Sequence, residues 1–341
     1  MKVLVTGVNG QLGHDVVKEL LHRGYAAIGS GSKAGDCVKL YVTGFEGQLG
    51  YNVFNDGDRT VHNSTGSDSK PVPVALKNGN AVVLAPYVQM DITDGVVVSR
   101  TIEELKPDVI IHCAAWTNVD GAEAPENRDK VHQINAVGTE NIAKAAKSVD
   151  AKMVYISTDY VFDGQGTRPW EPDDKNYAPL NYYGQTKLEG EQSVSSTLDK
   201  FFIVRIAWVF GLNGKNFIKT MINVGKSHDT VRVVNDQIGT PTYTLDLARL
   251  LVDMIETEKY GFYHATNEGG YISWYDFCCE FYRQYGLATT VIPVTTAEYG
   301  LSKAARPRNS RLDKSKLITT GFSPLPDWQD AISRYLKEAE L

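Results

Sequence analysis

The chain has 341 residues, of which 42% are hydrophobic and 22% charged, and its formal net charge is -6. A chain of this length and composition buries a substantial core, which excludes a mainly disordered protein. The negative charge gives no general attraction to nucleic acid or to an anionic membrane. The first residues contain no apolar run long enough for a signal peptide or a membrane span, so we expect a cytoplasmic protein whose partner is a small molecule.

Buried strands and amphipathic helices alternate up to about residue 208. Short apolar runs predict strands at 2–5, 26–28, 88–90, 108–115, 153–157 and 201–206. Helical spacing of apolar residues predicts helices at 14–23, 96–105, 131–148 and 183–195. This alternation favours the α/β class, with a doubly wound parallel sheet of the Rossmann type in residues 1–208.

The pattern becomes less regular after residue 208. Clusters of Asn, Gly, Pro and Thr separate short apolar pieces, and helices are predicted at 245–256, 274–285 and 327–337. We expect residues 209–341 to form mainly a smaller substrate-binding lobe, interleaved with the last elements of the sheet.

Residues 31–80 form an atypical insertion in the predicted sheet domain. The sequence V-T-G-F-E-G-Q-L-G-Y-N-V-F at 42–54 repeats V-T-G-V-N-G-Q-L-G-H-D-V-V at 5–17. The second copy runs into Asn-Asp-Gly at 55–57 instead of a helix, so we expect it to bind no cofactor. Farther on, apolar runs on both sides of K-N-G-N at 77–80 predict a β-hairpin.

Three glycines lie at the turn between the first strand and the first helix. Gly7, Gly10 and Gly13 allow a tight turn and a close approach of the backbone to a diphosphate. The start of the helix adds free N–H groups and the positive end of its dipole. The spacing differs by one residue from the dinucleotide fingerprint, and its position predicts that residues 1–208 bind NAD(P).

The end of the second strand lacks the acidic residue that usually binds an unphosphorylated ribose, because residues 29–33 read G-S-G-S-K. Ser30, Ser32 and Lys33 would instead accept a 2′-phosphate, which favours NADPH, although Asp36 keeps NADH open. Residues 91 and 92, after the third strand, are expected beside the adenine ring.

Tyr183 and Lys187 stand one helical turn apart in Y-G-Q-T-K. We expect the ammonium to stabilise the phenolate and lower the pKa of Tyr183, so that the pair exchanges a proton with a carbonyl oxygen during hydride transfer. Tyr299 and Lys303 have the same spacing. The first pair is favoured because it follows a strand that ends in S-T-D at 157–159.

Further motifs extend along the chain: H-C-A-A-W-T-N-V-D at 112–120, I-N-A-V-G-T-E-N at 134–141, S-T-D-Y-V-F-D-G at 157–164, Y-G-Q-T-K-L-E-G-E at 183–191, R-I-A-W-V-F-G at 205–211 and V-N-D-Q-I-G-T-P-T at 234–242. With the glycine loop, they make the chain resemble the extended short-chain dehydrogenases/reductases. Within that superfamily it resembles the dTDP-4-dehydrorhamnose reductase family, over nearly the whole length outside 31–80.

The resemblance implies reduction of the 4-keto group of dTDP-4-dehydro-L-rhamnose to dTDP-L-rhamnose with NADPH or NADH. Tyr183 would give the proton, Lys187 would hold the nicotinamide ribose, and Thr158 would hydrogen-bond the reacting oxygen. Asp159 and Trp208 would contact the sugar. The expected cofactor-binding residues are Gly7, Gly10, Gln11, Leu12, Gly13, Ser30, Asp91, Ile92, Ala114, Ala115, Trp116, Thr117, Tyr183 and Lys187.

Several points stay open. Arg306, Arg308 and Arg311 fit the substrate diphosphate or a solvated basic face. Magnesium at a dimer contact is associated with some relatives, but no ligand cluster stands out here, and both a monomer and a homodimer are compatible with the sequence. Four cysteines without C-x-x-C spacing, at 37, 113, 278 and 279, are expected to be inert.

Two other functions remain as alternatives. A nucleotide-sugar epimerase or dehydratase of the same superfamily would retain NAD through its cycle. A non-catalytic regulatory subunit of methionine adenosyltransferase would bind a partner protein instead of converting a sugar. The presence of Thr158, Tyr183 and Lys187 together favours the reductase.

Overall fold

The computed structural model describes residues 1–31, 38–42, 72–77, 80–85 and 87–339. Ser32, Lys33, Asp36 and Cys37 lie outside the described residues, and so does the second glycine motif from residue 43 onward. Within the described part, no helix has both the length and the hydropathy needed to cross a lipid bilayer.

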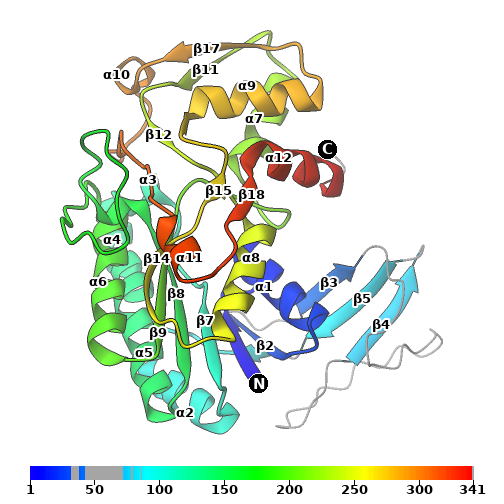
Figure 1. The fold of residues 1–341 in the computed structure, drawn as a ribbon, viewed down its shortest axis with the longest axis vertical. Coiled ribbons are helices and arrows are strands. Elements are labelled where there is room, and N and C mark those ends of the chain that lie inside the picture. The colour runs from blue at the N-terminus through cyan, green and yellow to red at the C-terminus, as the bar shows by residue number, and fades with distance from the viewer. Residues whose placement is uncertain (32–37, 43–71, 78–79, 86, 340–341) are drawn as a thin grey trace.

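A seven-stranded sheet forms the centre of the molecule (Figure 1). Every neighbouring pair of its strands is parallel. In spatial order the strands are β14 (Gly261–His264), β9 (Phe201–Ile206), β8 (Lys152–Thr158), β7 (Val109–His112), β1 (Lys2–Thr6), β2 (Ala26–Gly31) and β6 (Tyr87–Gln89). Four strands from the first 208 residues, β9, β8, β7 and β6, flank β1 and β2 in the order that crossovers through helices require.

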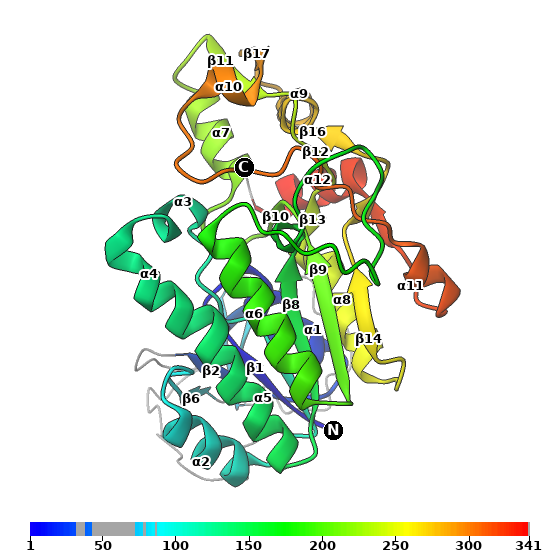
Figure 2. The same ribbon diagram turned by 90° about the vertical axis from the view of Figure 1, so that its left-hand side faces the viewer.

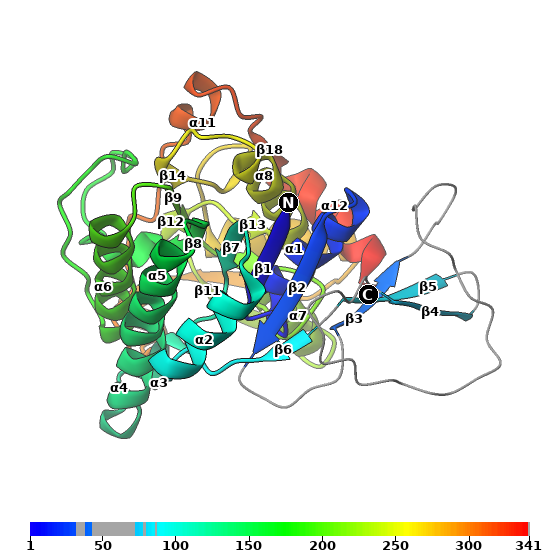
Figure 3. The same ribbon diagram turned by 90° about the horizontal axis from the view of Figure 1, so that it is seen from below.

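Helices cover both faces of this sheet, as the view along it shows (Figure 3). One layer contains α2 (Gly95–Leu105), α5 (Gly138–Ser148) and α6 (Tyr182–Thr197), and the other contains α1 (Gln11–His22) and α8 (Thr244–Ile255). The side chains of β1 from Val3 to Val5 are fully buried, since a parallel strand covered on both faces has no solvent side. The predicted doubly wound α/β fold is confirmed.

The helix predicted at 131–148 is interrupted. The structure has α4 (Pro125–His132), a π-helical turn (Gln133–Val137) and then α5. In the π turn the buried Asn135 accepts a hydrogen bond from the N–H of Trp116 at 2.8 Å and donates one to its carbonyl at 3.2 Å. Apolar periodicity does not reveal such a polar contact, and single π turns are frequent near functional sites.

The C-terminal half adds a second layer of structure beyond the strand ends (Figure 2). This lobe has its own aromatic core, which includes Phe210, Tyr243, Phe277 and Tyr335. Because α8 and β14 return to the central sheet, the lobe is interleaved with it. Its helices are α7 (Phe217–Gly225), α9 (Trp274–Tyr285), α10 (Thr296–Tyr299), α11 (Ser315–Thr319) and α12 (Trp328–Glu338). Its strand pairs are β10 (Val209–Phe210) with β13 (Thr242–Tyr243), β11 (Thr230–Val234) with β17 (Thr290–Val294), β12 (Ile238–Gly239) with β16 (Ile272–Ser273), and β15 (Asn267–Glu268) with β18 (Leu325–Asp327).

The predicted hairpin is present between β2 and β6. The strands β4 (Val72–Lys77) and β5 (Asn80–Ala85) are antiparallel, and β3 (Val38–Val42) pairs with the other side of β5. This small sheet lies at the edge of the molecule, beyond α1 and β2 (Figures 1 and 3). The chain leaves the central sheet after β2 and returns to it at β6. These two strands are neighbours, since Gly31 at the end of β2 pairs with Gln89 of β6.

A buried ion pair joins α6 to the sheet. The guanidinium of Arg205 on β9 binds both carboxylate oxygens of Glu191 on α6, at 2.8 and 2.7 Å, and both residues are almost fully buried. Two more of its N–H groups donate to the carbonyl of Pro172 and the hydroxyl of Tyr177, at 3.0 and 2.9 Å. The buried charge of Arg205 is therefore balanced by the carboxylate of Glu191 and hydrogen-bonded to protein groups.

Replacement of Glu191 by Ala should lower the free energy of unfolding by about 3–5 kcal/mol, because it leaves the Arg205 charge buried without its partner. Urea unfolding followed by circular dichroism measures this loss. The matched control is Glu171→Ala, which breaks an exposed pair with Arg168 at 3.0 Å and should cost less than about 1 kcal/mol. Equal losses in the two variants would contradict the structural role of the buried pair.

Candidate active site

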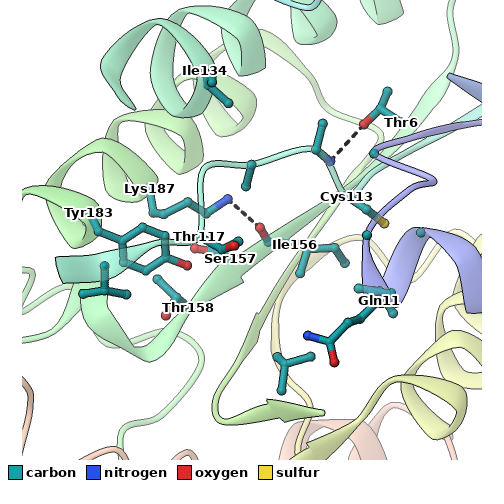
Figure 4. Close-up of a pocket in the computed structure, with 18 of the residues that line it drawn as sticks. Thr6, Gln11, Cys113, Thr117, Ile134, Ile156, Ser157, Thr158, Tyr183 and Lys187 are labelled. Carbon is teal, nitrogen blue, oxygen red and sulfur yellow. Dashed lines mark hydrogen bonds between the residues drawn. The ribbon is translucent and has the colours of Figure 1, made fainter. Parts of the chain in front are cut away.

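A cleft of about 1670 Å³ opens at the carboxyl ends of the parallel strands, beneath the C-terminal lobe. This is the edge where ligands bind in doubly wound sheets. The cleft is larger than the roughly 300–1,000 Å³ of ordinary ligand pockets, so it has room for a dinucleotide and a second ligand together. Figure 4 shows side chains from β1, β8, α1 and α6, and from the segment that follows β7, converging on it.

Nearly all of the predicted site residues line this cleft. They are Gly7, Gly10, Gln11, Leu12, Gly13, Ser30, Asp91, Ile92, Ala114, Ala115, Thr117, Thr158, Asp159, Tyr183, Lys187 and Trp208. Trp116 is not among the lining residues. Its indole N–H donates to the carbonyl of Asn118 at 2.9 Å, and its backbone is held by Asn135.

The glycine loop fits closely against the neighbouring strand end. Gly7 has a φ of 70°, and a Cβ there would lie 2.6 Å from the backbone nitrogen of Ala114. A Cβ on Gly13 would lie 2.5 Å from the carbonyl oxygen of Gly7. The helix that follows has no side-chain cap at Gly10 and no acidic residue in its first turn. Its free N–H groups therefore make a site for an anion at this end of the cleft.

Ser30 is the second-last residue of β2 and lies beside the glycine loop. Its carbonyl accepts the N–H of Gly7 at 3.0 Å. The side chain is almost fully buried, and its hydroxyl has no hydrogen-bond partner among the described residues. A buried hydroxyl without a partner costs about 1–3 kcal/mol, which a polar ligand group can recover.

The helix α6 brings Tyr183 and Lys187 to the other end of the cleft (Figure 4). It starts at Asn181, whose side chain accepts the N–H of Gly184 at 2.8 Å, a helix cap. The ammonium of Lys187 donates to the carbonyl of Ile156 at 2.7 Å and lies 4.0 Å from the centre of the Tyr155 ring.

Electrostatics at this pair differ from the sequence-based expectation. Burial raises the pKa of Tyr183, and the negative charge of Asp159 raises it further to a smaller extent. A hydrogen bond with Thr158 lowers the pKa but does not reverse the rise. Burial also lowers the pKa of Lys187 to about 7. The expected lowering of the Tyr183 pKa is therefore wrong, because burial of the phenol dominates. A raised pKa keeps the phenol protonated, which is the state that a proton donor requires.

Thr158 and Asp159 lie together at the end of β8. The hydroxyl of Thr158 donates to the carboxylate of Asp159 at 3.1 Å and accepts the N–H of Tyr160 at 3.3 Å. Asp159 is almost fully buried and accepts a second hydrogen bond from the hydroxyl of Ser310. Burial raises its pKa to about 6. Asp159 is thus part of the cleft wall and not an exposed surface charge.

Trp208 forms an aromatic wall with residues that sequence reasoning missed. Its backbone has a φ of 51°, a left-handed conformation that is strained for a large side chain. Its indole stacks on Trp274 with ring centres 4.0 Å apart, and Phe217 packs edge-on against Trp274. All three line the cleft. The helix that begins at Trp274 was predicted, but nothing in the local sequence indicated that Trp274 or Phe217 would reach the cleft.

Ser157 is another cleft residue that the sequence did not identify, although it stands in the S-T-D motif at 157–159. Its side chain is almost fully buried at the cleft, and its hydroxyl has no partner among the described residues. The signal that would have identified it is its position directly before Thr158, at the carboxyl end of a central strand.

The basic segment 306–311 does not converge on the cleft as a group. Arg306 lines it, but its guanidinium binds both carboxylate oxygens of Asp120, at 3.0 and 2.8 Å. Arg308 is mostly exposed, and Arg311 bonds Asn309 at 3.0 Å; neither is among the lining residues.

The second Tyr–Lys pair is not arranged like the first. The helix α10 ends at Tyr299, and Gly300 turns the chain with a φ of 62°, so Lys303 does not follow on the same helical face.

Cys113 lines the cleft, but burial raises the pKa of its thiol to about 12. Among the described residues, no three His, Cys, Asp or Glu side chains converge as metal ligands would.

The pKa of Asp159 predicts a pH-dependent stability. Its pKa is about 6 in the folded protein and 3.8 normally, so the folded state binds the proton more tightly. Its contribution is therefore complete below about pH 4 and is lost as the pH rises through 6, by up to about 3 kcal/mol. The free energy of unfolding of the native protein, minus that of Asp159→Asn, should fall over this range in urea titrations. A difference that does not change with pH would contradict the raised pKa of the buried Asp159 carboxyl group.

The chain is similar in sequence to one protein family and in structure to solved members of it. The family described as "RmlD substrate binding domain" matches residues 38–341. A dTDP-4-dehydrorhamnose reductase of Streptomyces griseus is 39% identical over 267 residues, covering 76% of this chain and 86% of the relative. A crystal structure of such a reductase from Clostridium acetobutylicum is 36% identical, with a TM-score of 0.78 and full coverage of both chains. A second crystal structure, of a dTDP-4-dehydrorhamnose reductase from Bacillus anthracis, was solved in complex with NADP. It is 35% identical, with a TM-score of 0.78, and covers 99% of this chain and 100% of its own.

Proposed function

Because the chain belongs to the dTDP-4-dehydrorhamnose reductase family, we propose that it reduces the 4-keto group of dTDP-4-dehydro-L-rhamnose to give dTDP-L-rhamnose with NAD(P)H. The observation that carries the proposal is one cleft with an anion site at the glycine loop and Thr158, Tyr183 and Lys187 at its opposite end. Such a cleft holds a dinucleotide along the strand ends and a carbonyl beside the tyrosine.

The residues present fit a nicotinamide dinucleotide. Gly7 and Gly13 let the turn close tightly against Ala114 and against the turn itself, and the uncapped start of α1 offers N–H groups to a diphosphate. Ser30 offers a hydroxyl beside that loop that has no partner in the part of the chain that the structure describes. The bound cofactor supplies the hydride. Residues 1–208 hold the cofactor in this proposal, and residues 209–341 mainly cover the substrate.

The chain's own residues supply the proton and the positioning. The phenol of Tyr183 gives its proton to the sugar oxygen as the carbonyl carbon receives the hydride, and it regains a proton from solvent. Thr158 donates a hydrogen bond to the same oxygen while charge develops on it. Lys187, fixed by the carbonyl of Ile156, holds the nicotinamide ribose. Asp159 and Trp208 contact the sugar.

Replacement of Tyr183 by Phe should lower kcat about 100- to 10,000-fold, since it removes the proton donor but keeps the ring. The loss of absorbance of the reduced nicotinamide, with dTDP-4-dehydro-L-rhamnose as substrate, measures this rate. Tyr299→Phe is the matched control and should keep the native rate. Cofactor affinity should stay unchanged in Tyr299→Phe.

The same assay tests the function itself. The native enzyme should consume one reduced nicotinamide for each sugar reduced. A protein that converts the sugar without net consumption, and that retains NAD after purification, would be an epimerase or dehydratase. Absence of turnover with both NADPH and NADH would overturn the reductase proposal.

We propose a preference for NADPH, because Ser30 stands where an acidic residue would bind the ribose of NADH. Ser30→Asp should reverse the preference, since its carboxylate repels a 2′-phosphate and accepts hydrogen bonds from a free ribose. The ratio of kcat/KM for the two cofactors is the readout. A native ratio that favours NADH, or a ratio unaffected by Ser30→Asp, would contradict this assignment.

A further inference from the structure

A loop of the C-terminal lobe, residues 211–216, is docked on the glycine loop. The side chain of Asn213 donates to the carbonyls of Asn9 and Gly10, at 2.9 and 3.2 Å. The side chain of Asn216 donates to Gln11 at 3.3 Å. Three hydrogen bonds therefore fix this loop to the turn that would face the diphosphate.

The loop has a defined shape. The ammonium of Lys219, on the first turn of α7, binds the carbonyls of Leu212 and Gly214. Gly214 has a φ of 80°, which turns the chain directly before Lys215. Asn216 then caps α7 by accepting the N–H of Lys219 at 3.0 Å. This arrangement holds the backbone of Lys215 at the cleft, next to the glycine loop.

Among the described residues that line the cleft, Lys215 is the cation that is not already engaged. Four basic residues line the cleft: Lys130, Lys187, Lys215 and Arg306. Lys187 donates to the carbonyl of Ile156, and Arg306 is bound to Asp120. Lys130 lies over the ring of Trp116, at 5.8 Å. Lys215 is exposed and has no hydrogen-bond or ion-pair partner among the described residues.

We propose that Lys215 binds the pyrophosphate of the nicotinamide dinucleotide, next to the start of α1. This inference rests on the proposed function. A helix start carries only about half a positive charge, whereas a pyrophosphate carries two negative charges, so a nearby free ammonium completes the site. A lysine suits this role because it acts as a mobile point charge toward phosphate oxygens. The loop brings this charge from the substrate lobe, so the cofactor would contact both halves of the molecule.

The test is the affinity of Lys215→Ala for NADPH and for NADH, measured by titration of nicotinamide fluorescence. Both dissociation constants should rise about tenfold, because both cofactors carry the pyrophosphate. The affinity of the variant should also depend less on salt concentration. Lys215→Arg should keep most of the native affinity, and unchanged thermal unfolding would show that the variants fold.

Lys226→Ala is the matched control. It removes the same charge just after the far end of α7, where the ammonium lies over the ring of Tyr285 at 5.1 Å. Both cofactor affinities should stay at the native value.

Three results would overturn the inference. Weaker binding of NADPH alone would place Lys215 at the 2′-phosphate. A raised KM for the sugar nucleotide with native cofactor binding would place it at the substrate diphosphate. Native values throughout would give it no binding role. Failure of the native protein to bind either cofactor would instead overturn the proposed function, which distinguishes the two.

Discussion

The close approach of α6 to the end of β8 is the constraint on which the site depends. A Cβ on Gly184 would lie 2.3 Å from the carbonyl oxygen of Tyr160, and one on Gly190 would lie 2.3 Å from the hydroxyl of Tyr155. Only glycine lets the helix backbone come this near. Tyr183 directly precedes the first contact and Lys187 lies between the two, so both side chains reach the strand end and its cleft.

This approach also explains why the buried face of α6 is polar. Thr186 and Lys187 are buried on it, and their partners come from several elements. Asn135 in the π turn donates to the hydroxyl of Thr186 at 3.1 Å, and Tyr155 of β8 donates to the carbonyl of Lys187 at 3.2 Å. Each of these buried groups has a partner, so the network orients the helix without an uncompensated desolvation cost. An apolar face would pack as well but would not define the rotation of the helix.

The sequence predicted the sheet and the turn that carries the glycines at the cleft well, because local patterns determine both. Alternating strands and helices have clear periods, and Gly7 and Gly13 stand in one turn. It did less well where distant segments meet. Trp274 reaches Trp208 through the packing of two lobes, and the break in the helix around Asn135 depends on a backbone contact to Trp116. The pKa of Tyr183 was predicted in the wrong direction because burial cannot be read from the spacing of two residues.

The parallel pairing of β2 with β6 has a consequence for how this fold tolerates added sequence. The segment between them leaves at Gly31 and returns at Tyr87, on strands that are direct neighbours. The entropy of closing a loop grows only with the logarithm of its length, about 0.6 kcal/mol for each doubling. Once the two ends are held side by side, many extra residues cost little and leave the register of the sheet unchanged. This edge is therefore a place where a new module can be acquired in evolution, or grafted by design, without rebuilding the enzyme around it.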